Sequence, residues 1–192
     1  MSENLLSALT TFGLSSNQTK ELFLEHSTIK KYNKNDILVS TEERNDKEYF
    51  LIEGVLHRFN NDERGDIITT GFYLGSTVVT PHFARTIRGK SLFSLQALTD
   101  VHLAVIPVST LDNLRHTHKA FLLFGQKVID EELSKNMLVD IAYRSSSAKE
   151  RLLLLRKMYP NLENLIPHNI IASYLGITNV SFSRLRGELA KK

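Results

Sequence analysis

The most specific pattern in this 192-residue chain is His168-Asn-Ile-Ile-Ala-Ser-Tyr-Leu-Gly-Ile-Thr-Asn-Val-Ser-Phe-Ser-Arg-Leu-Arg186. Two helices that cross at a sharp angle need a small residue where their backbones meet, and Ala172 supplies it. The turn between them needs a left-handed backbone, which Gly176 adopts at little cost. Apolar residues stand where the space between the helices must be filled: Ile171, Leu175, Ile177, Phe182 and Leu185. The spacing therefore predicts a helix-turn-helix.

The second helix of this pair should begin at Thr178, whose side chain suits an N-cap. Its exposed first turns would carry Asn179, Val180, Ser183 and Arg184, with Ser181 close by. In a helix-turn-helix, this is the end that enters the major groove of DNA.

The polar side chains at this end differ in the part of DNA that each suits. Arg184 can form paired hydrogen bonds to a guanine edge, and Asn179 can read adenine. Phosphate contacts, which position a protein without reading sequence, suit Thr178, Ser181, Ser183 and Arg186. The alternative for Arg184 is a surface charge or a phosphate contact, and for Asn179 an exposed residue at a helix start.

Charge is unevenly spread along the chain. The segment from Lys149 to Lys192 has eight basic and three acidic residues, a formal charge of +5, so the remainder carries −2 of the total +3. A basic end on a near-neutral body suits a polyanionic partner. Charge alone is equally compatible with a solvated basic surface.

Residues 36–106 alternate short apolar runs with turn residues, which is typical of a sandwich or roll of β-strands. The expected strands cover residues 36–39, 49–52, 54–59, 67–74, 94–98 and 101–106. Residues 62–66 are predicted to form a hairpin tip, because Gly65 tolerates a positive φ. Before the strands, residues 4–28 have the apolar spacing of one or two short helices.

A helical period begins at Ser109 and extends to about Tyr143. A helix of about 25 residues here would span roughly 37 Å, so it should leave its own domain and meet a partner. The residues expected at a two-stranded seam are Leu122, Ile129, Leu133 and Met137. Polar residues interrupt the heptad, so packing within the chain is the alternative to dimerisation.

The segment after the long helix combines a hinge with a helix start. Residues 144–147 are the predicted hinge, and Ser147 and Glu150 have the spacing of a capping box. The helix that follows should stop before Pro160, because the residue before a proline avoids helical dihedrals.

Several classes of protein are not expected. The chain has no cysteine, which excludes disulfides and cysteine-held iron–sulfur clusters and suits the cytoplasm. We expect neither a signal peptide nor a membrane-spanning helix. A metal-dependent cupin-like enzyme is the main rival, but His57, His82 and His102 stand on separate segments, and no nucleophile elbow or glycine-rich phosphate loop is present. We therefore expect a protein that is not an enzyme and holds no metal.

The order of β-roll, long helix and helix-turn-helix resembles the Crp/Fnr superfamily. The stretches that carry the resemblance are Ile171-Ala-Ser-Tyr-Leu-Gly-Ile-Thr178 and Ser183-Arg-Leu-Arg186, which look like Bacteroidetes-type members, with Tyr49-Phe-Leu-Ile-Glu-Gly54, Ala97-Leu-Thr-Asp100 and Ser147-Ala-Lys-Glu-Arg151. The resemblance implies an α+β fold in three parts. These are an antiparallel β-roll of the cyclic nucleotide-binding type (a double-stranded β-helix) over residues 1–115, a dimerisation helix over 116–144 and a helix-turn-helix domain over 145–192.

The resemblance also implies a function. Such proteins are homodimers that bind two-fold symmetric double-stranded DNA and change transcription in response to a ligand in the roll. RNA polymerase is then a further expected partner, and a membrane is not. The rival reading is a ligand-binding or protein-interaction module that does not bind DNA.

Two departures from the family pattern limit what the resemblance implies. Nucleotide-binding members carry a Gly-Glu pair and then an Arg-Ser or Arg-Thr pair, and here Thr80-Pro81 and Lys90-Ser91 stand near those places. Without the acid and the bidentate arginine, the usual mode of cyclic-AMP binding is not expected, and no cofactor is assigned. Lys90 and Ser91 are the remaining candidates for contact with an effector. Only three residues follow Leu189, so we expect no full wing after the helix-turn-helix.

Overall fold

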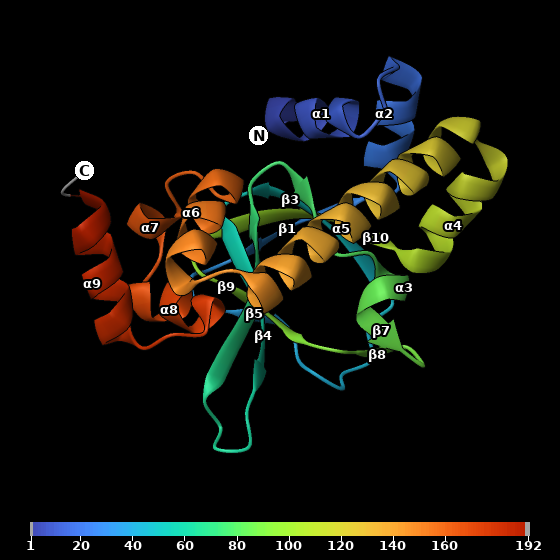
Figure 1. Cartoon of the computed structure of the whole chain (residues 1–192). Helices are drawn as coiled ribbons and strands as arrows, with labels where there is room; N and C mark the ends of the chain where they lie inside the picture. Colours follow the sequence, from blue (N-terminus) through green and yellow to red (C-terminus); the bar gives the residue numbers. More distant parts are fainter. Residues whose placement is uncertain (1, 191–192) are drawn as a thin grey trace.

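The computed structural model describes residues 2–190, arranged as an N-terminal helical pair, a β-roll, a long helix and a C-terminal helical module (Figure 1). One sheet has the order β1 (Thr28–Tyr32), β10 (Val101–Pro107), β3 (Lys47–Glu53) and β6 (Thr77–Val78). The other has the order β2 (Ile37–Val39), β9 (Ser94–Ala97), β4 (Val55–Asn61) and β5 (Ile67–Leu74). All of these strand pairs are antiparallel, which confirms the predicted fold class.

The roll is closed around side chains from both sheets. Inward-facing residues that share its core include Tyr49, Leu56, Tyr73, Phe93 and Leu103. A short excursion between β6 and β9 holds α3 (His82–Arg85) and the small hairpin of β7 (Thr86–Ile87) and β8 (Lys90–Ser91). β4 and β5 form a long hairpin whose tip includes Gly65 at φ 85°, as predicted.

Helices before and after the roll cover one of its ends. α1 (Ser2–Thr11), α2 (Asn17–Glu25), α4 (Val108–Thr117) and α5 (Lys119–Ser145) share an apolar core with the roll. The helical period that begins at Ser109 is divided between α4 and α5, because His118 has an extended backbone at φ −132°, ψ 114°. The long helix therefore begins at Lys119.

The C-terminal module contains α6 (Ala148–Met158), α7 (Leu162–Leu165), α8 (His168–Leu175) and α9 (Asn179–Ala190). The predicted capping box is confirmed: the Glu150 backbone N–H donates to Ser147 Oγ at 3.3 Å, and the Ser147 N–H donates to Glu150 Oε2 at 2.8 Å. α6 ends before Pro160, also as predicted.

The C-terminal module is packed directly on the roll (Figure 1). The fully buried Phe72 of β5 places its ring 5.7 Å from that of Tyr159 and 5.0 Å from that of Tyr174. Val55, Phe72 and Leu98 of the roll belong to the same apolar cluster as the core of the module. Ser173 of α8 accepts from the Thr69 N–H at 3.0 Å and donates to the Ile67 carbonyl at 2.8 Å. Apolar packing and β5 hydrogen bonds thus fix the position of α8.

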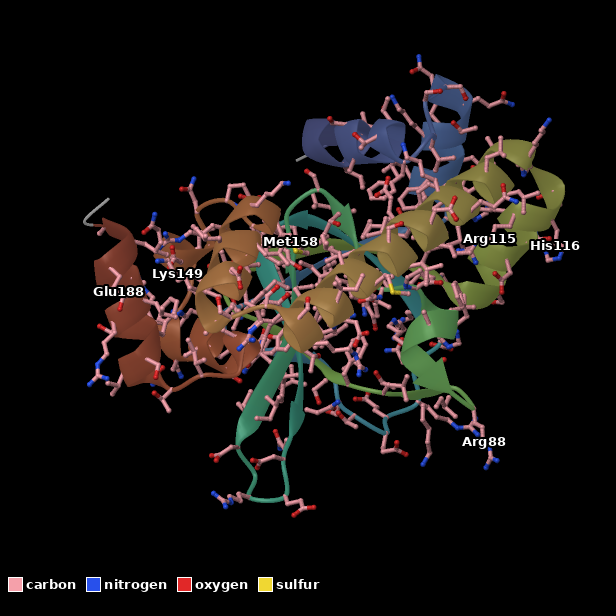
Figure 2. The ribbon with its side chains drawn as sticks, in the orientation of Figure 1. Arg88, Arg115, His116, Lys149, Met158 and Glu188 are labelled. Carbon is pink, nitrogen blue, oxygen red and sulfur yellow. The ribbon has the colours of Figure 1, made fainter. Side chains whose placement is uncertain are left out.

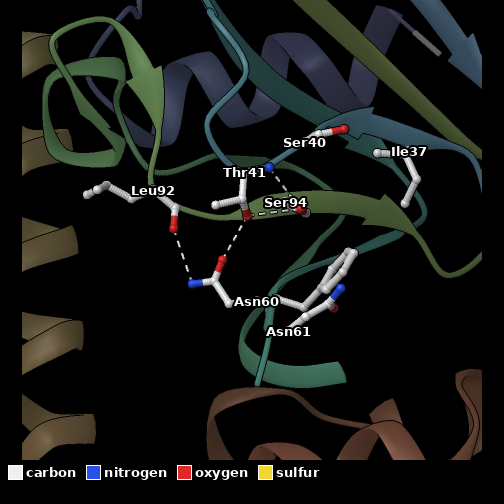
Figure 3. Close-up of a pocket in the computed structure, with 8 residues that line it drawn as sticks. Ile37, Ser40, Thr41, Asn60, Asn61, Leu92 and Ser94 are labelled. Carbon is white, nitrogen blue, oxygen red and sulfur yellow. Dashed lines mark hydrogen bonds between the residues drawn. The ribbon is translucent and has the colours of Figure 1, made fainter. Parts of the chain in front are cut away.

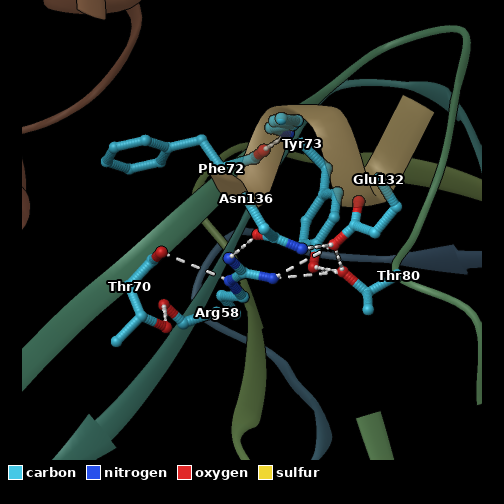
Figure 4. A network of polar contacts seen from close by, with 8 residues as sticks. Arg58, Thr70, Phe72, Tyr73, Thr80, Glu132 and Asn136 are labelled. Atoms are coloured by element: carbon cyan, nitrogen blue, oxygen red, sulfur yellow. Dashed lines mark hydrogen bonds and ion pairs between the residues drawn. The ribbon is translucent and has the colours of Figure 1, made fainter. Parts of the chain in front are cut away.

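A polar network joins the roll to α5 (Figure 4). Arg58 of β4 lies 3.4 Å from the Glu132 carboxylate and donates to Asn136 Oδ1 at 3.0 Å. Thr80 donates to the same carboxylate at 2.6 Å. Lys135 lies over the rings of Tyr73 and Tyr159, and burial lowers the pKa of its ammonium group. The network therefore connects the roll, the long helix and Tyr159, the residue that follows α6.

Replacing Phe72 with alanine should lower the free energy of unfolding by about 3–5 kcal/mol, because a large buried ring would leave a cavity between roll and module. Urea denaturation measures the change. Phe83→Ala is the matched control: Phe83 is 58% exposed, so a change within about 0.5 kcal/mol is expected. Equal effects of the two substitutions would contradict this account of the core.

Replacing Arg58 with methionine should lower the free energy of unfolding by up to about 3–5 kcal/mol, because it takes the guanidinium away from the mostly buried Glu132 carboxylate. The double variant Arg58→Met/Glu132→Gln should be more stable than Arg58→Met alone, since it also removes the carboxylate whose guanidinium partner is lost. Denaturation of the four proteins in a double-mutant cycle gives the coupling energy. Additivity within about 0.5 kcal/mol would show that the two side chains do not act as a pair.

Candidate nucleic-acid interface

The turn between α8 and α9 has the geometry that the sequence predicts. Gly176 ends α8 in the left-handed region at φ 65°, ψ 37°, and its N–H donates to the Ser173 carbonyl at 3.0 Å. The Ile177 N–H then reaches back to the Ala172 carbonyl at 3.0 Å. These bonds satisfy carbonyls at the end of α8 and set the direction in which α9 leaves.

α9 begins as expected and presents its first turns to solvent. Thr178 accepts the Ser181 backbone N–H at 3.2 Å, which confirms the N-cap. Phe182 is buried between the helices, while Val180 is 61% exposed. The side chains that share the exposed surface are Thr178, Asn179, Val180, Ser183 and Arg184, with Ser181 half-buried beside them. The structure thus gathers the predicted DNA-contacting residues at one end of α9, and their contact with DNA stays a prediction.

The two arginines of α9 have different surroundings. Arg184 is exposed and forms no ion pair within residues 2–190. Arg186 lies 3.5 Å from the Glu163 carboxylate, donates to His168 Nδ1 at 3.2 Å and covers the ring of Phe182. Arg184 is therefore free to reach a base edge or a phosphate, whereas Arg186 is held along the side of the module.

Sequence reasoning missed the group that holds Arg186. Glu163 also accepts from Arg156, at 2.8 Å and 3.3 Å, and so bridges α6, α7 and α9. The local sequence carried no signal for this group, because its three members come from separate helices. The basic charge of the module is thus only partly free: Arg156 and Arg186 share one carboxylate.

The β4–β5 hairpin runs beside the start of α9. An open groove of about 590 Å³ separates them, lined among others by Asp66, Ile67, Asn169 and Asn179. Asp66 therefore lies across this groove from Asn179 at the exposed start of α9.

The outward face of α5 is an unpaired apolar stripe. Its inner side buries Phe121, Phe124 and Val128 against the roll and the N-terminal helices. The four residues that were predicted for a dimer seam all lie exposed on the other side: Leu122, Ile129, Leu133 and Met137, with Leu133 at 63% exposure. Packing within the chain therefore does not account for these residues.

The predicted effector residues, Lys90 and Ser91, both have partners within the chain. Lys90 is exposed and lies 3.3 Å from Glu42, and Ser91 is buried with its hydroxyl donating to the Phe93 carbonyl at 2.7 Å. Thr80 is hydrogen-bonded to Glu132 of α5. Each of these polar groups thus already has a partner from the chain, and effector binding through Lys90 and Ser91 stays a prediction.

A groove of about 710 Å³ opens on the roll beside β2, β4 and β9 (Figure 3). Its lining has no charged side chain. Thr41 donates to Asn60 Oδ1 at 2.8 Å, and Asn60 donates to the Leu92 carbonyl at 3.1 Å. Because no lining residue is charged, the groove offers an anionic ligand no positively charged partner.

Neither a group of metal ligands nor a membrane-spanning helix is found within residues 2–190. No three of the described histidine, aspartate and glutamate side chains are grouped as metal ligands. No described helix combines the length and the apolar character needed to cross a bilayer.

Comparison with known proteins relates this architecture to solved structures. No protein-family model and no curated protein matches the chain. FixK2 from Bradyrhizobium japonicum matches with a TM-score of 0.73 and 18% identity, over 86% of this chain and 85% of that one. A CooA variant from Carboxydothermus hydrogenoformans matches with a TM-score of 0.74 and 19% identity, over 98% and 84%.

A third match is the c-di-GMP responsive global regulator CLP of Xanthomonas campestris, with a TM-score of 0.69 and 15% identity over 92% of both chains. These TM-scores show a shared architecture, and at identities below 20% they show the fold alone; the three proteins are Crp/Fnr regulators. The chain therefore has the Crp/Fnr fold.

Proposed function

We propose that this protein is a DNA-binding transcription regulator that acts as a homodimer. The observation that carries the proposal is the exposed start of α9, where Asn179, Ser183 and Arg184 project from a rigid helix-turn-helix. Such a helix end presents hydrogen-bonding side chains to a major groove, and an arginine is the side chain best suited to a guanine edge. The regulators that share the fold are consistent with this function.

A second copy of the chain is the proposed partner of the α5 stripe. A two-fold symmetric pair would bury Leu122, Ile129, Leu133 and Met137 against their equivalents, as in a two-stranded seam. It would also present two copies of α9 to one duplex, where successive major grooves lie about 34 Å apart. A dimer of this kind would thus both cover the apolar face of α5 and supply one α9 for each of two major grooves.

We also propose that a ligand bound to the roll controls DNA binding. β5 of the roll contacts α8, so a ligand that bound one arrangement of roll and module more tightly would shift the population of DNA-competent molecules. The partners of Lys90, Ser91 and Thr80 within the chain do not favour cyclic AMP as that ligand. A regulator of this kind works in the cytoplasm, with RNA polymerase as the expected further partner.

Replacing Arg184 with alanine should weaken binding to the preferred operator by about 1–3 kcal/mol and relax its sequence preference, because a base contact is lost. Selection from random duplex DNA followed by fluorescence anisotropy gives the operator and the affinity. Arg88→Ala is the control that removes the same charge, since Arg88 projects from the β7–β8 turn at the opposite end of the molecule (Figure 2). Unchanged affinity and preference in Arg184→Ala would show that Arg184 does not read the operator.

The salt dependence of wild-type binding tests the proposal itself. Affinity for DNA should fall steeply as salt rises, because each neutralised phosphate releases counterions. A protein that selects no sequence and shows no such slope would be a protein-interaction or ligand-binding module instead.

Replacing Leu133 with glutamate should convert the dimer to monomers and weaken operator binding by at least about tenfold, since a charge would enter an apolar seam. Sedimentation equilibrium measures the oligomeric state. Ser134→Glu is the control, because it adds the same charge at the next exposed position of α5. A Leu133→Glu protein that remained dimeric would place the interface elsewhere.

A further inference from the structure

Arg151 lies where three parts of the chain meet. It belongs to the first turn of α6 and donates through Nη1 to the Ser146 carbonyl at 2.8 Å, in the connection that follows α5. Through Nη2 it donates to the Leu175 carbonyl at 3.0 Å, at the end of α8. Its guanidinium carbon lies 5.2 Å from the ring centre of Tyr143, in the last turns of α5. One side chain thus contacts the long helix, the connection and the helix-turn-helix.

The chemistry of this contact makes it directional. A guanidinium is planar and holds its donors in a fixed fork, so bonds to two carbonyls set both their separation and their relative angle. The Leu175 carbonyl ends a helix, where a positive charge is favourable. Tyr143 supplies a flat face for the cation and meets Tyr174 of α8 edge-to-face, with ring centres 6.1 Å apart.

We propose that Arg151 is a positioning residue that sets the angle between α5 and α9, and thereby the spacing of the two DNA half-sites that a dimer accepts. This proposal rests on the function proposed above. If two copies pair along α5, the separation of their recognition helices depends on how each module is held relative to that helix. Each added base pair moves a half-site by about 3.4 Å along the duplex axis and turns it by roughly a tenth of a helical turn.

Arg151 shares this task with the roll. The bonds between Ser173 and β5 restrain the far side of α8, and Arg151 restrains its C-terminal end. Removal of the guanidinium therefore leaves the module folded and attached but less narrowly oriented. The expected consequence is a wider tolerance of spacer length, with the reading of each half-site unchanged.

The test compares full-length wild type with Arg151→Gln on the selected operator and on versions with one or two base pairs added or removed between half-sites. Wild type should lose about tenfold or more in affinity for a one-base-pair change, equivalent to roughly 1.4 kcal/mol. In Arg151→Gln this ratio should fall below about threefold, with the same half-site sequence selected. Arg144→Gln is the matched control: it removes the same charge near the connection, and the side-chain bonds of Arg144 within residues 2–190 go to Asp140 alone.

A folding defect would lower the active fraction on every spacer equally, so it would not change the ratio. If Arg151→Gln does not fold, Arg151→Lys keeps the charge without the fork, and Tyr143→Leu removes the aromatic face; both should widen the spacer profile. An unchanged profile in folded variants would overturn the role of Arg151. Failure of wild type to select any paired half-sites would instead overturn the proposed function.

Discussion

The C-terminal module and the roll share one apolar core, and the orientation of α9 depends on that packing. Phe72 is a residue of the sheet, yet its ring lies among Tyr159 and Tyr174 of the module. Full burial of a phenylalanine is worth about 1.5–3 kcal/mol relative to exposure, so separation of the two parts would expose surface at considerable cost. α9 is therefore held by tertiary packing as well as by its covalent link to α5.

This packing changes how a hinge at residues 144–147 would operate. A serine-rich connection between two helices is free to rotate only if nothing else restrains the segments that it joins. Here Arg151 binds the Ser146 carbonyl, and β5 binds Ser173. A change in the orientation of α9 must therefore rearrange contacts of α8 with the roll or of Arg151 with the connection. The free energy of reorientation thus depends on those contacts.

The sequence allowed the local features of the fold to be predicted, and the reason is their short range. The Thr178 and Ser147 caps, the Gly176 turn and the Gly65 hairpin tip each depend on residues within about four positions. β1 was missed because its sequence, Thr28-Ile-Lys-Lys-Tyr32, is polar and mostly exposed and lacks an apolar run. The division at His118 was missed because Leu114 and Phe121, on either side of the polar residues 115–119, are seven positions apart, which is the spacing of two helical turns.

Contacts between residues far apart in the sequence could not be predicted from local sequence patterns. Arg58 and Glu132 are 74 positions apart, and nothing in the local sequence marks either as buried. They pair because α5 is packed against the roll beside β4. Glu163 likewise joins Arg156 and Arg186 from two helices. Conversely, the α5 stripe could be anticipated from the sequence, because the apolar residues of this helix cover a face wide enough for both packing within the chain and a two-stranded seam.

The fixed orientation of the module also determines which charges a bound duplex would experience. The formal charge of +5 belongs to the segment as a whole, but Glu163 neutralises part of it, and Asp66 of the β4–β5 hairpin lies across a groove from Asn179. At physiological ionic strength the screening length is about 8 Å, so only charges close to the phosphates contribute appreciably. Arg184 is exposed and unpaired among residues 2–190, and it lies on the same face as the α9 polar side chains. Its position relative to the duplex, rather than the net charge of the chain, therefore determines the electrostatic contribution of α9.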